Sequence, residues 1–212
     1  EQMKKIAIFV SGEGSNFQAI YNHIHIGDIQ GEIVLVISNN PKCGAIIFAC
    51  KQGLKNFIVN DTRFPNPNTR DKLLLQALLK AEVELICLAG YMKLLPKRIV
   101  KEYKDQILNI HPALLPQFGG KGFYGMKVHE AVIEAGAAES GVTVHLVDEE
   151  YDHGKIIAQK KVKIRSGDTA KTLAKRVLKV EHDLYPKVVK AFCKDRVVWE
   201  NNYPKIEDDI ED

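Results

Sequence analysis

ILNIHPALLP, residues 107–116, is typical of a short buried strand that carries two polar side chains and ends at a proline. Asn109 and His111 are two positions apart, so they project to the same face of an extended strand. Pro112 has no backbone N–H and cannot continue a central strand. An amide and a titratable imidazole are therefore expected together at the carboxyl end of a strand, where open α/β sheets bind their ligands. The alternative is a hydrogen-bonded core asparagine beside a structural histidine.

Apolar runs on both sides of this stretch predict the fold class. The runs at 4–11, 33–38 and 85–88 are nearly continuous, as in parallel strands that are covered on both faces. Residues 141–147 alternate in their side-chain pattern, and together with 155–163 they predict an antiparallel hairpin. We therefore expect one three-layer, Rossmann-like α/β domain with a mainly parallel twisted sheet and an antiparallel C-terminal hairpin.

Helical spacing and capping residues predict the helices between these strands. Helices are expected at 44–51, from about 69 to 81, at 126–135 and at 169–192. Asn68 or Thr69 is suited to cap the second of them. Pro186 is expected to interrupt the last, because proline lacks the N–H that a helix interior uses. The acidic residues 204–212 are expected to form a frayed tail.

Composition narrows the class of protein. Hydrophobic residues make up 45% and charged residues 27%, which are ordinary values for a globular protein with a sizeable core. The formal net charge is only +3, and the basic stretch 160–179 is interrupted by apolar residues, so a nucleic-acid surface is not expected. We expect neither a membrane span nor a signal peptide. The cysteines lack zinc-type spacing and suit a reducing cytoplasm; they are Cys43, Cys50, Cys87 and Cys193.

A glycine-rich loop predicts a phosphate site near the N-terminus. Gly12-Glu-Gly-Ser-Asn16 follows an apolar run and precedes a helical pattern, a setting in which backbone N–H groups at a helix N-terminus bind phosphate. The loop lacks the third glycine of a dinucleotide fingerprint, no Asp or Glu ends the next strand, and no G-K-[ST] occurs. A phosphate monoester is therefore favoured over NAD or ATP. The structural alternative is that Ser15 and Asn16 only cap the helix.

Three further segments are candidates for a site. Residues 89–96 form an apolar loop after a strand, either a plug of core side chains or a wall for a flat aromatic ligand. The glycine-rich residues 119–125 form a loop that could cover a site. The turn at 148–154 holds four carboxylates, and Asp152, close to Gly154, could reach a neighbouring strand end.

Five motifs together resemble the phosphoribosylglycinamide formyltransferases, folate-dependent enzymes of purine synthesis. The motifs are SGEGSN at 11–16, LAGYMKLL at 88–95, NIHPALLP at 109–116, GVTVHLVDEEYDHGKII at 141–157 and EHDLYP at 181–186. The resemblance covers residues 3 to about 199. NIHPALLP alone also resembles methionyl-tRNA formyltransferase and formyltetrahydrofolate deformylase, but those families lack the SGEGSN loop, and their additional domains are not expected here.

The resemblance implies a formyltransferase fold with two functional halves. The N-terminal half, about 3–103, would bind the phosphate of glycinamide ribonucleotide. The C-terminal half, about 104–199, would complete the folate site and carry catalysis, ahead of the acidic tail. The implied ribonucleotide-binding residues are Gly14, Ser15, Asn16 and Glu181. The implied folate-binding residues are Arg70, Met92, Lys93, Leu94, Leu95 and Asn109. The implied catalytic residues are Asn109, His111 and Asp152, and the resemblance also suggests a cis Leu115–Pro116 bond.

The implied reaction moves a formyl group from 10-formyltetrahydrofolate to the amine of glycinamide ribonucleotide. Asn109 and a protonated His111 would stabilise the oxyanion of a tetrahedral intermediate. Asp152 would raise the pKa of His111, and a proton would pass to N10 of the folate through His111 or through ordered water. No metal is expected, because the seven histidines have no ligand spacing. The expected partners are the two small molecules, and the chain would act as a monomer or homodimer.

Alternatives and departures from the family pattern remain. A formyl-folate hydrolase with the same three residues, a non-catalytic nucleotide-binding module and a dehydrogenase are the alternatives, the last disfavoured by the missing third glycine. Leu178 stands where some relatives have glutamine, and His153 and Lys155 replace a small residue and a proline. The loop at 119–125 differs in length, and Arg70 is only the best available choice for the folate-contacting arginine.

Overall fold

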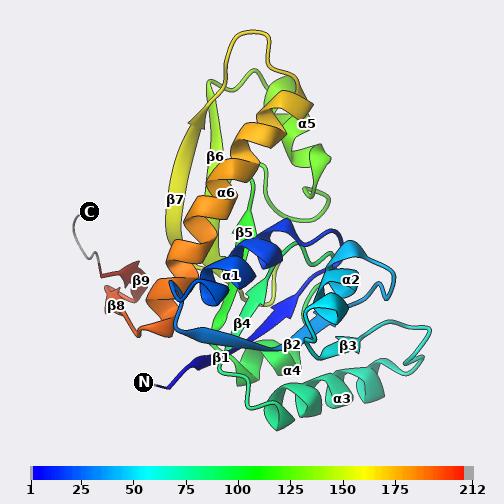
Figure 1. Ribbon diagram of the computed structural model, residues 1–212. Coiled ribbons are helices and arrows are strands. Elements are labelled where there is room, and N and C mark those ends of the chain that lie inside the picture. Colours follow the sequence, from blue (N-terminus) through cyan, green and yellow to red (C-terminus); the bar gives the residue numbers. More distant parts are fainter. Residues whose placement is uncertain (1, 208–212) are drawn as a thin grey trace. The chain divides into compact units, whose positions relative to one another are not determined.

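The computed structural model describes residues 2–207 of the chain (Figure 1). Its internal contacts divide the chain into two compact units, of which the first ends at Asn109 and the second begins at Ile110. The division falls inside a single strand, β5 (Ile107–His111). Within residues 2–207, no helix combines the length and the apolar character needed to cross a membrane.

The first unit is built on five parallel strands. They are β1 (Lys4–Phe9), β2 (Gly31–Ser38), β3 (Asn56–Ile58), β4 (Leu85–Leu88) and β5. Their order is β3-β2-β1-β4-β5, and each neighbouring pair is parallel. β1 is the central strand, and its residues from Ile6 to Phe9 have no exposed surface. Complete burial on both faces explains why the strand is a continuous apolar run instead of an alternating one.

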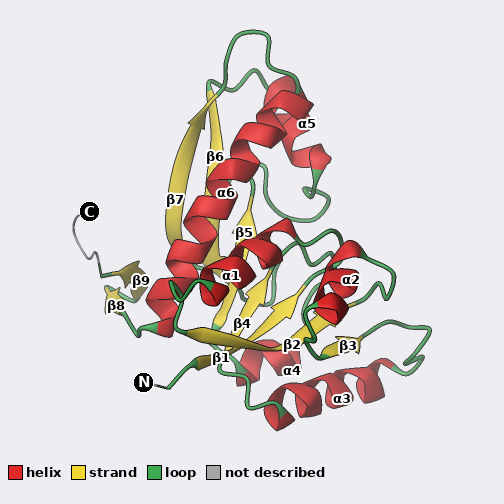
Figure 2. Ribbon diagram, in the orientation of Figure 1, coloured by secondary structure: helices red, strands yellow, loops and turns green. Residues whose placement is uncertain are grey.

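Helices cover both faces of this sheet. They are α1 (Ser15–His25), α2 (Gly44–Lys51), α3 (Pro67–Lys80) and α4 (Lys97–Glu102). Figure 2 shows α1 and α2 on one face and α3 and α4 on the other. α1 buries Phe17 and Ile20, and α3 buries Leu74 and Leu78, at the spacing of one helical face. The expected three-layer arrangement is confirmed.

The second unit combines an antiparallel hairpin with two helices. Its elements after β5 are α5 (Met126–Glu134), β6 (Glu139–Leu146), β7 (Ile156–Lys163), α6 (Ala170–Cys193), β8 (Val197–Glu200) and β9 (Tyr203–Ile206). β6 and β7 pair antiparallel from Glu139 opposite Lys163 to His145 opposite Ile156. α6 packs against both strands of the hairpin and against α5.

The strand order of the main sheet is β3-β2-β1-β4-β5-β6-β7, and β8 and β9 form a separate two-stranded sheet. The mainly parallel sheet with its antiparallel C-terminal hairpin agrees with the sequence-based prediction. The Leu115–Pro116 peptide bond is cis, as the family resemblance suggested. The two-stranded β8–β9 sheet was not expected.

Two helix predictions were wrong in detail. α3 begins at Pro67, and its cap is Asn66, whose side chain accepts a hydrogen bond from the N–H of Thr69 at 3.1 Å. Proline suits the first helical position because that residue's N–H has no partner within the helix. α6 continues through Pro186 without interruption. Packing of its apolar face against the hairpin and α5 compensates for the hydrogen bond that proline omits.

One strand, β6, is more completely buried than an alternating pattern implies, and the predicted tail needs correction. β6 is buried on both faces from Ser140 to Leu146, so its alternation does not separate a buried face from a solvated one. Residues 204–206 belong to β9 and pair with β8, so the segment predicted as a tail begins as a strand. The remaining tail residues, 208–212, lie outside the described residues.

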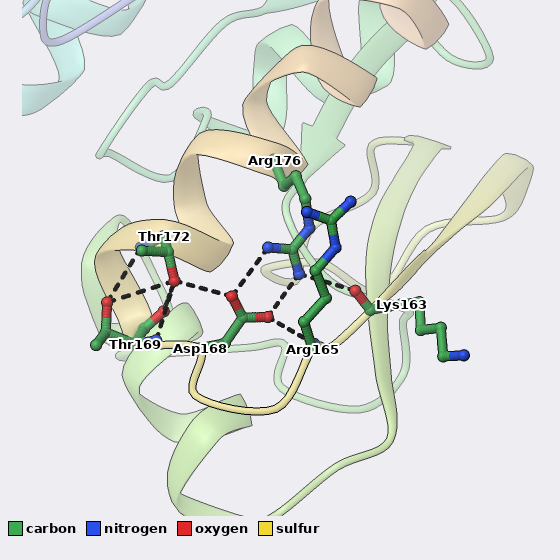
Figure 3. Close-up of polar contacts among 6 residues, drawn as sticks. All are labelled: Lys163, Arg165, Asp168, Thr169, Thr172 and Arg176. Carbon is green, nitrogen blue, oxygen red and sulfur yellow. Dashed lines mark hydrogen bonds and ion pairs between the residues drawn. The ribbon is translucent and has the colours of Figure 1, made fainter.

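The connection from β7 to α6 is tied by a dense polar cluster (Figure 3). The Asp168 carboxylate accepts hydrogen bonds from both terminal nitrogens of Arg176, at 2.9 and 2.6 Å, and from the backbone N–H of Arg165 at 2.7 Å. Thr172 also donates to Asp168, and Thr172 and Thr169 form a capping box at the start of α6. These bonds hold the pKa of Asp168 well below its usual range, chiefly through the side chain of Arg176.

Candidate active site

The glycine loop between β1 and α1 depends on one unusual backbone conformation. Gly14 has a φ of 74° and a ψ of 40°, in the left-handed region that favours glycine, and it is the N-cap of α1. A Cβ atom on Gly14 would lie 2.8 Å from the Cβ of Ala45. In the described part of the chain, no side chain caps α1 by a hydrogen bond. Ser15 and Asn16 are therefore first-turn residues and not caps, and they stand where a helix N-terminus favours an anion.

The same loop is attached to the first turn of α2. The N–H of Ala45 donates to the carbonyl of Gly12 at 3.1 Å. The Glu13 carboxylate lies against Gly44, where a Cβ atom would collide with it. A negative group beside the first residue of a helix is favourable, because the helix N-terminus carries a partial positive charge. The carboxylate of Glu13 is thus engaged at α2.

The segment after β4 turns at Gly90, which has a φ of 75°, and then presents the predicted folate residues. Met92 and Leu94 expose 42% and 45% of their surface, whereas Leu95 is buried at 4%. Lys93 is exposed as well. The segment therefore combines a core residue with apolar side chains that are available to a flat ligand.

Arg70 lies on α3 and is held by two carboxylates. Its guanidinium donates to Asp61 at 2.7 Å and to Asp71 at 3.1 Å. A folate contact by Arg70 would compete with both interactions, so its assignment stays a prediction. Arg98 on the neighbouring α4 donates to Asn68 at 2.9 Å.

β5 carries the two polar residues of the NIH motif at successive positions on one face. Asn109 is half-buried and lies opposite Leu88 of β4 in the parallel register. His111, the last residue of the strand, is only 4% exposed. Both residues lie at the carboxyl end of a buried strand, as their spacing predicted.

Asp152 lies between two imidazoles in the second unit. One carboxylate oxygen is 3.4 Å from Nδ1 of His111 and 3.8 Å from Nε2 of His145. The other oxygen accepts the backbone N–H of Gly120 at 3.0 Å. Asp152 has a φ of 53°, and its side chain is 10% exposed. This is the left-handed region, which aspartate adopts more readily than most non-glycine residues.

His111 has a hydrogen-bond acceptor at each ring nitrogen. Nε2 is 2.7 Å from the carbonyl oxygen of Phe118, and Nδ1 faces Asp152. Burial nevertheless lowers the pKa of His111 below its ordinary value, and the nearby His145 lowers it further. Asp152 and the Phe118 carbonyl oppose this shift without reversing it. The expected influence of Asp152 has the right sign, but the expected net rise in the pKa of His111 was wrong, because desolvation is the larger effect.

Asp152 is a carboxylate with a lowered pKa. Burial alone would raise the pKa of this group, but the contact with His145 and the charge of His111 outweigh burial, and the N–H of Gly120 adds to them. Nδ1 of His145 lies 2.8 Å from the carbonyl oxygen of Leu146, which orients the ring. At neutral pH the cluster is therefore a buried anion flanked by two imidazoles.

The backbone around His111 and Asp152 is set by a buried hydroxyl and by glycines. Thr143 on β6 donates to the carbonyl of Ala113 at 2.7 Å and accepts the N–H of Leu115 at 3.1 Å. A side chain on Gly119 would collide with Leu115 and crowd Asp152. A side chain on Gly154 would collide with the backbone carbonyl of Leu146, so the end of the 148–154 turn lies directly against β6.

Three groups of this cluster were not predicted from the sequence. His145 stood in the β6 pattern on the same face as Thr143, and that shared face was the available signal. The carbonyl of Phe118 and the N–H of Gly120 are backbone groups, which carry no signal in the sequence. Glu181 lies on α6 and is only 8% exposed, an unusual position for a carboxylate. Across residues 2–207, no group of three or more His, Cys, Asp or Glu side chains is arranged to hold a metal ion.

Residues 4–189 match the model of the formyl transferase family. The chain is 46% identical to the chloroplastic phosphoribosylglycinamide formyltransferase of Arabidopsis thaliana, over 96% of this chain and 70% of that protein. It is 37% identical to the phosphoribosylglycinamide formyltransferase of Haemophilus influenzae, over 94% of this chain and 92% of that protein. Across three plant relatives, the chain spans between 63% and 70% of their lengths.

A solved structure agrees with these sequence matches. The crystal structure of glycinamide ribonucleotide transformylase 1 from Symbiobacterium toebii superposes with a TM-score of 0.88 at 34% identity. The match covers 97% of this chain and 95% of that one. A match over 97% of the chain includes residues of both units.

Proposed function

Because the chain belongs to the formyl transferase family, we propose that it transfers a formyl group from 10-formyltetrahydrofolate to the amine of 5′-phosphoribosylglycinamide. The products would be formylglycinamide ribonucleotide and tetrahydrofolate, in purine biosynthesis. The observation that carries the proposal is the buried Asp152 carboxylate between His111 and His145. Such a cluster suits chemistry in which charge develops and a proton moves.

The glycine loop is proposed as the phosphate site of the ribonucleotide. Gly14 shapes the loop, and the first N–H groups of α1, at Ser15 and Asn16, would bind the phosphate. The position of Glu13 is compatible with this role, because its carboxylate is engaged against Gly44 at the start of α2. Glu181 is proposed to meet the glycinamide end of the ribonucleotide, as the resemblance of EHDLYP at 181–186 to the family implies.

The folate site is proposed to use the segment after β4. Met92 and Leu94 offer exposed apolar surface for the pteridine, and Lys93 is exposed beside them. Backbone groups of this loop and the amide of Asn109 would supply the polar contacts. Arg70 is retained as the candidate for the acidic end of the folate.

The proposed chemistry assigns separate tasks to the amide and the imidazole. Attack of the amine on the formyl carbon would give a tetrahedral oxyanion, to which Asn109 would donate a hydrogen bond. A buried His111 with a lowered pKa is a weak base when free and a ready proton donor once charged. Negative charge on the nearby oxyanion and on Asp152 would favour the imidazolium during the reaction. His111 would take a proton from the attacking amine and pass it to N10 of the folate as the bond between the formyl carbon and N10 breaks, directly or through water.

Turnover with both substrates tests the proposal. The purified chain should convert 10-formyltetrahydrofolate and glycinamide ribonucleotide into tetrahydrofolate and formylglycinamide ribonucleotide, followed by absorbance and by mass spectrometry. A reaction without the amine acceptor is the matched control. Formate release at the same rate in that control would indicate a hydrolase and contradict the proposal, and so would the absence of turnover with both substrates.

We further propose that the chain works on these small molecules as a monomer or homodimer in a reducing compartment, the cytoplasm in the simplest case. The four cysteines are free thiols, which supports a reducing environment. Analytical ultracentrifugation of the wild-type chain at micromolar concentration would measure the assembly state, and a larger oligomer would contradict this part.

A further inference from the structure

Ser11 occupies a junction at the carboxyl edge of the parallel sheet. It follows the central strand β1 by two residues and is half-buried. β2 pairs with β1 on one side and β4 on the other. Because the three strands are parallel, their carboxyl ends emerge at the same edge. A residue that leaves β1 is therefore within reach of the segments that leave both neighbours.

The hydroxyl of Ser11 connects those two segments. It accepts the backbone N–H of Met92, after β4, at 2.8 Å, and it donates to the side-chain oxygen of Asn39, after β2, at 2.5 Å. A backbone N–H can only donate, so the hydroxyl must accept from Met92, and its single proton is directed to Asn39. The backbone N–H of Ser11 also donates to the carbonyl of Gly90 at 3.0 Å.

Each end of this connection is anchored. The backbone carbonyl of Asn39 accepts a hydrogen bond from the side chain of Asn60 at 3.1 Å. Tyr91 packs edge-on against Phe9 of β1, with ring centroids 5.2 Å apart. Displacement of Met92 would therefore also move Ser11, because the anchored residues at both ends of the connection restrict other movements.

We infer that Ser11 is a positioning residue that couples the proposed ribonucleotide loop, residues 12–16, to the proposed folate segment, residues 92–95. The inference rests on the proposed function for the identity of the two ligands. The loop begins at the residue after Ser11, and the folate segment begins at the residue that donates to its hydroxyl. A ligand that orders one segment restrains the other through this shared side chain. By linkage, each ligand then raises the affinity for the other by the same factor.

Calorimetric titration of Ser11→Ala tests the coupling with two probes, glycinamide ribonucleotide and tetrahydrofolate. The second probe carries no formyl group, so both can be present without reaction. Loss of one neutral hydrogen bond predicts an affinity for each ligand that is about fivefold weaker. The affinity for one ligand should also become independent of the other. Ser11→Thr keeps the hydroxyl and should restore most of the coupling.

Ser38→Ala is the matched control. Ser38 is a buried serine at the end of β2 whose hydroxyl bonds the backbone of Asn40 at 3.2 and 3.1 Å, within its own turn. It should lower stability without abolishing the coupling. Loss of affinity for one ligand alone in Ser11→Ala, or equal loss of coupling in Ser38→Ala, would overturn the inference.

A measurement without ligands separates this inference from the proposed function. In Ser11→Ala, the Met92 amide should exchange with solvent faster than in the wild type, by hydrogen exchange and NMR. The amide resonances of 12–16 and 92–95 should shift together. A wild-type chain that shows no turnover would contradict the proposed function, while these amide shifts would still support the connection. Unchanged exchange at Met92 would overturn it.

Discussion

The glycine loop of the first unit and the Asp152 cluster of the second are built from different parts of the polypeptide. The loop depends on backbone: Gly14 takes a left-handed conformation, and α1 begins directly after it. The cluster depends on ionisable side chains, with Asp152 between His111 and His145. An added methyl group should therefore damage the first, whereas an isosteric change that removes a charge should damage only the second.

The largest effect is expected from removing the imidazole of the cluster. His111→Ala should lower kcat by a factor of about 10²–10⁴, because proton transfer by a positioned side chain typically contributes a factor of that size. Steady-state kinetics at saturating concentrations of both substrates measure this loss. His153→Ala removes an exposed imidazole from the 148–154 turn and should have little effect. If His111→Ala retained more than a tenth of the wild-type kcat, the proposed role of the cluster in the reaction would be contradicted.

Asp152→Asn keeps the shape and removes the charge. Since Asp152 raises the pKa of His111 against the effect of burial, the variant should lower that pKa further. NMR titration of His111 measures the shift, and the acid limb of the kcat profile should move to lower pH with it. A His111 pKa that stays in place would show that the two side chains are not coupled.

The same lowered pKa predicts a stability effect with a definite sign. Folded His111 is neutral in the window between its lowered pKa and the unfolded value of about 6.5, where the unfolded chain binds the proton. Stability is therefore lost as the pH falls through 6.5, and the loss levels off below the folded pKa. Urea unfolding at several pH values should show a shallower loss in His111→Ala.

An intermediate effect is expected from a single methyl group in the loop. Gly14→Ala forces a Cβ towards Ala45 in a left-handed conformation and should weaken ribonucleotide binding about tenfold, with folate binding nearly intact. Gly12→Ala is the matched control, because Gly12 has no positive φ and its Cβ would meet open space. Calorimetric titration of both variants with each ligand measures the two affinities separately. Equal loss of both ligands in Gly14→Ala would mean that the glycine serves folding alone.

The smallest effect on activity is expected at the polar cluster of Figure 3. Asp168→Asn should lower the thermal unfolding temperature at pH 7 and leave kcat unchanged, because Asp168 ties β7 to α6 through Arg176. Its pKa is lowered in the folded chain, so its stabilisation is present above about pH 3.9 and is lost as the pH falls through the folded pKa. The difference between wild type and variant should shrink in acid. Asp183→Asn, at an exposed pair with Lys187, is the control.

Much of this architecture was predictable because burial leaves a pattern in the sequence. The apolar runs of β1 and β4 and the placement of Asn109 and His111 at a strand end followed from side-chain alternation and proline positions. The position of Asp152 near Gly154 indicated only that its carboxylate could reach a strand end, and its catalytic role was implied by the family resemblance. The direction of the pKa shift of His111 was not predictable, since it depends on how completely the folded chain excludes water from the imidazole.

A backbone group of the site and the continuity of α6 were not predicted either, because both depend on contacts made only in the folded chain. The Phe118 carbonyl lies close to His111 only because the loop after β5 folds back toward that side chain. No residue type in the sequence predicts this geometry. The continuity of α6 through Pro186 likewise depends on tertiary packing that local propensity does not include. Local rules identified the elements, and long-range contacts decided how the site was completed.

The close approach of Gly154 to Leu146 has a consequence for how this turn tolerates genetic change. Residues at its tip, such as Glu150 and His153, are exposed and should tolerate replacement. Gly154 is closed to every other amino acid, because any side chain would meet a main-chain carbonyl. An insertion or deletion between Asp152 and Gly154 would displace the carboxylate from its place. A library of 148–154 that combines substitutions with single insertions and deletions should therefore return active chains with diverse tips, a constant length and only glycine at position 154.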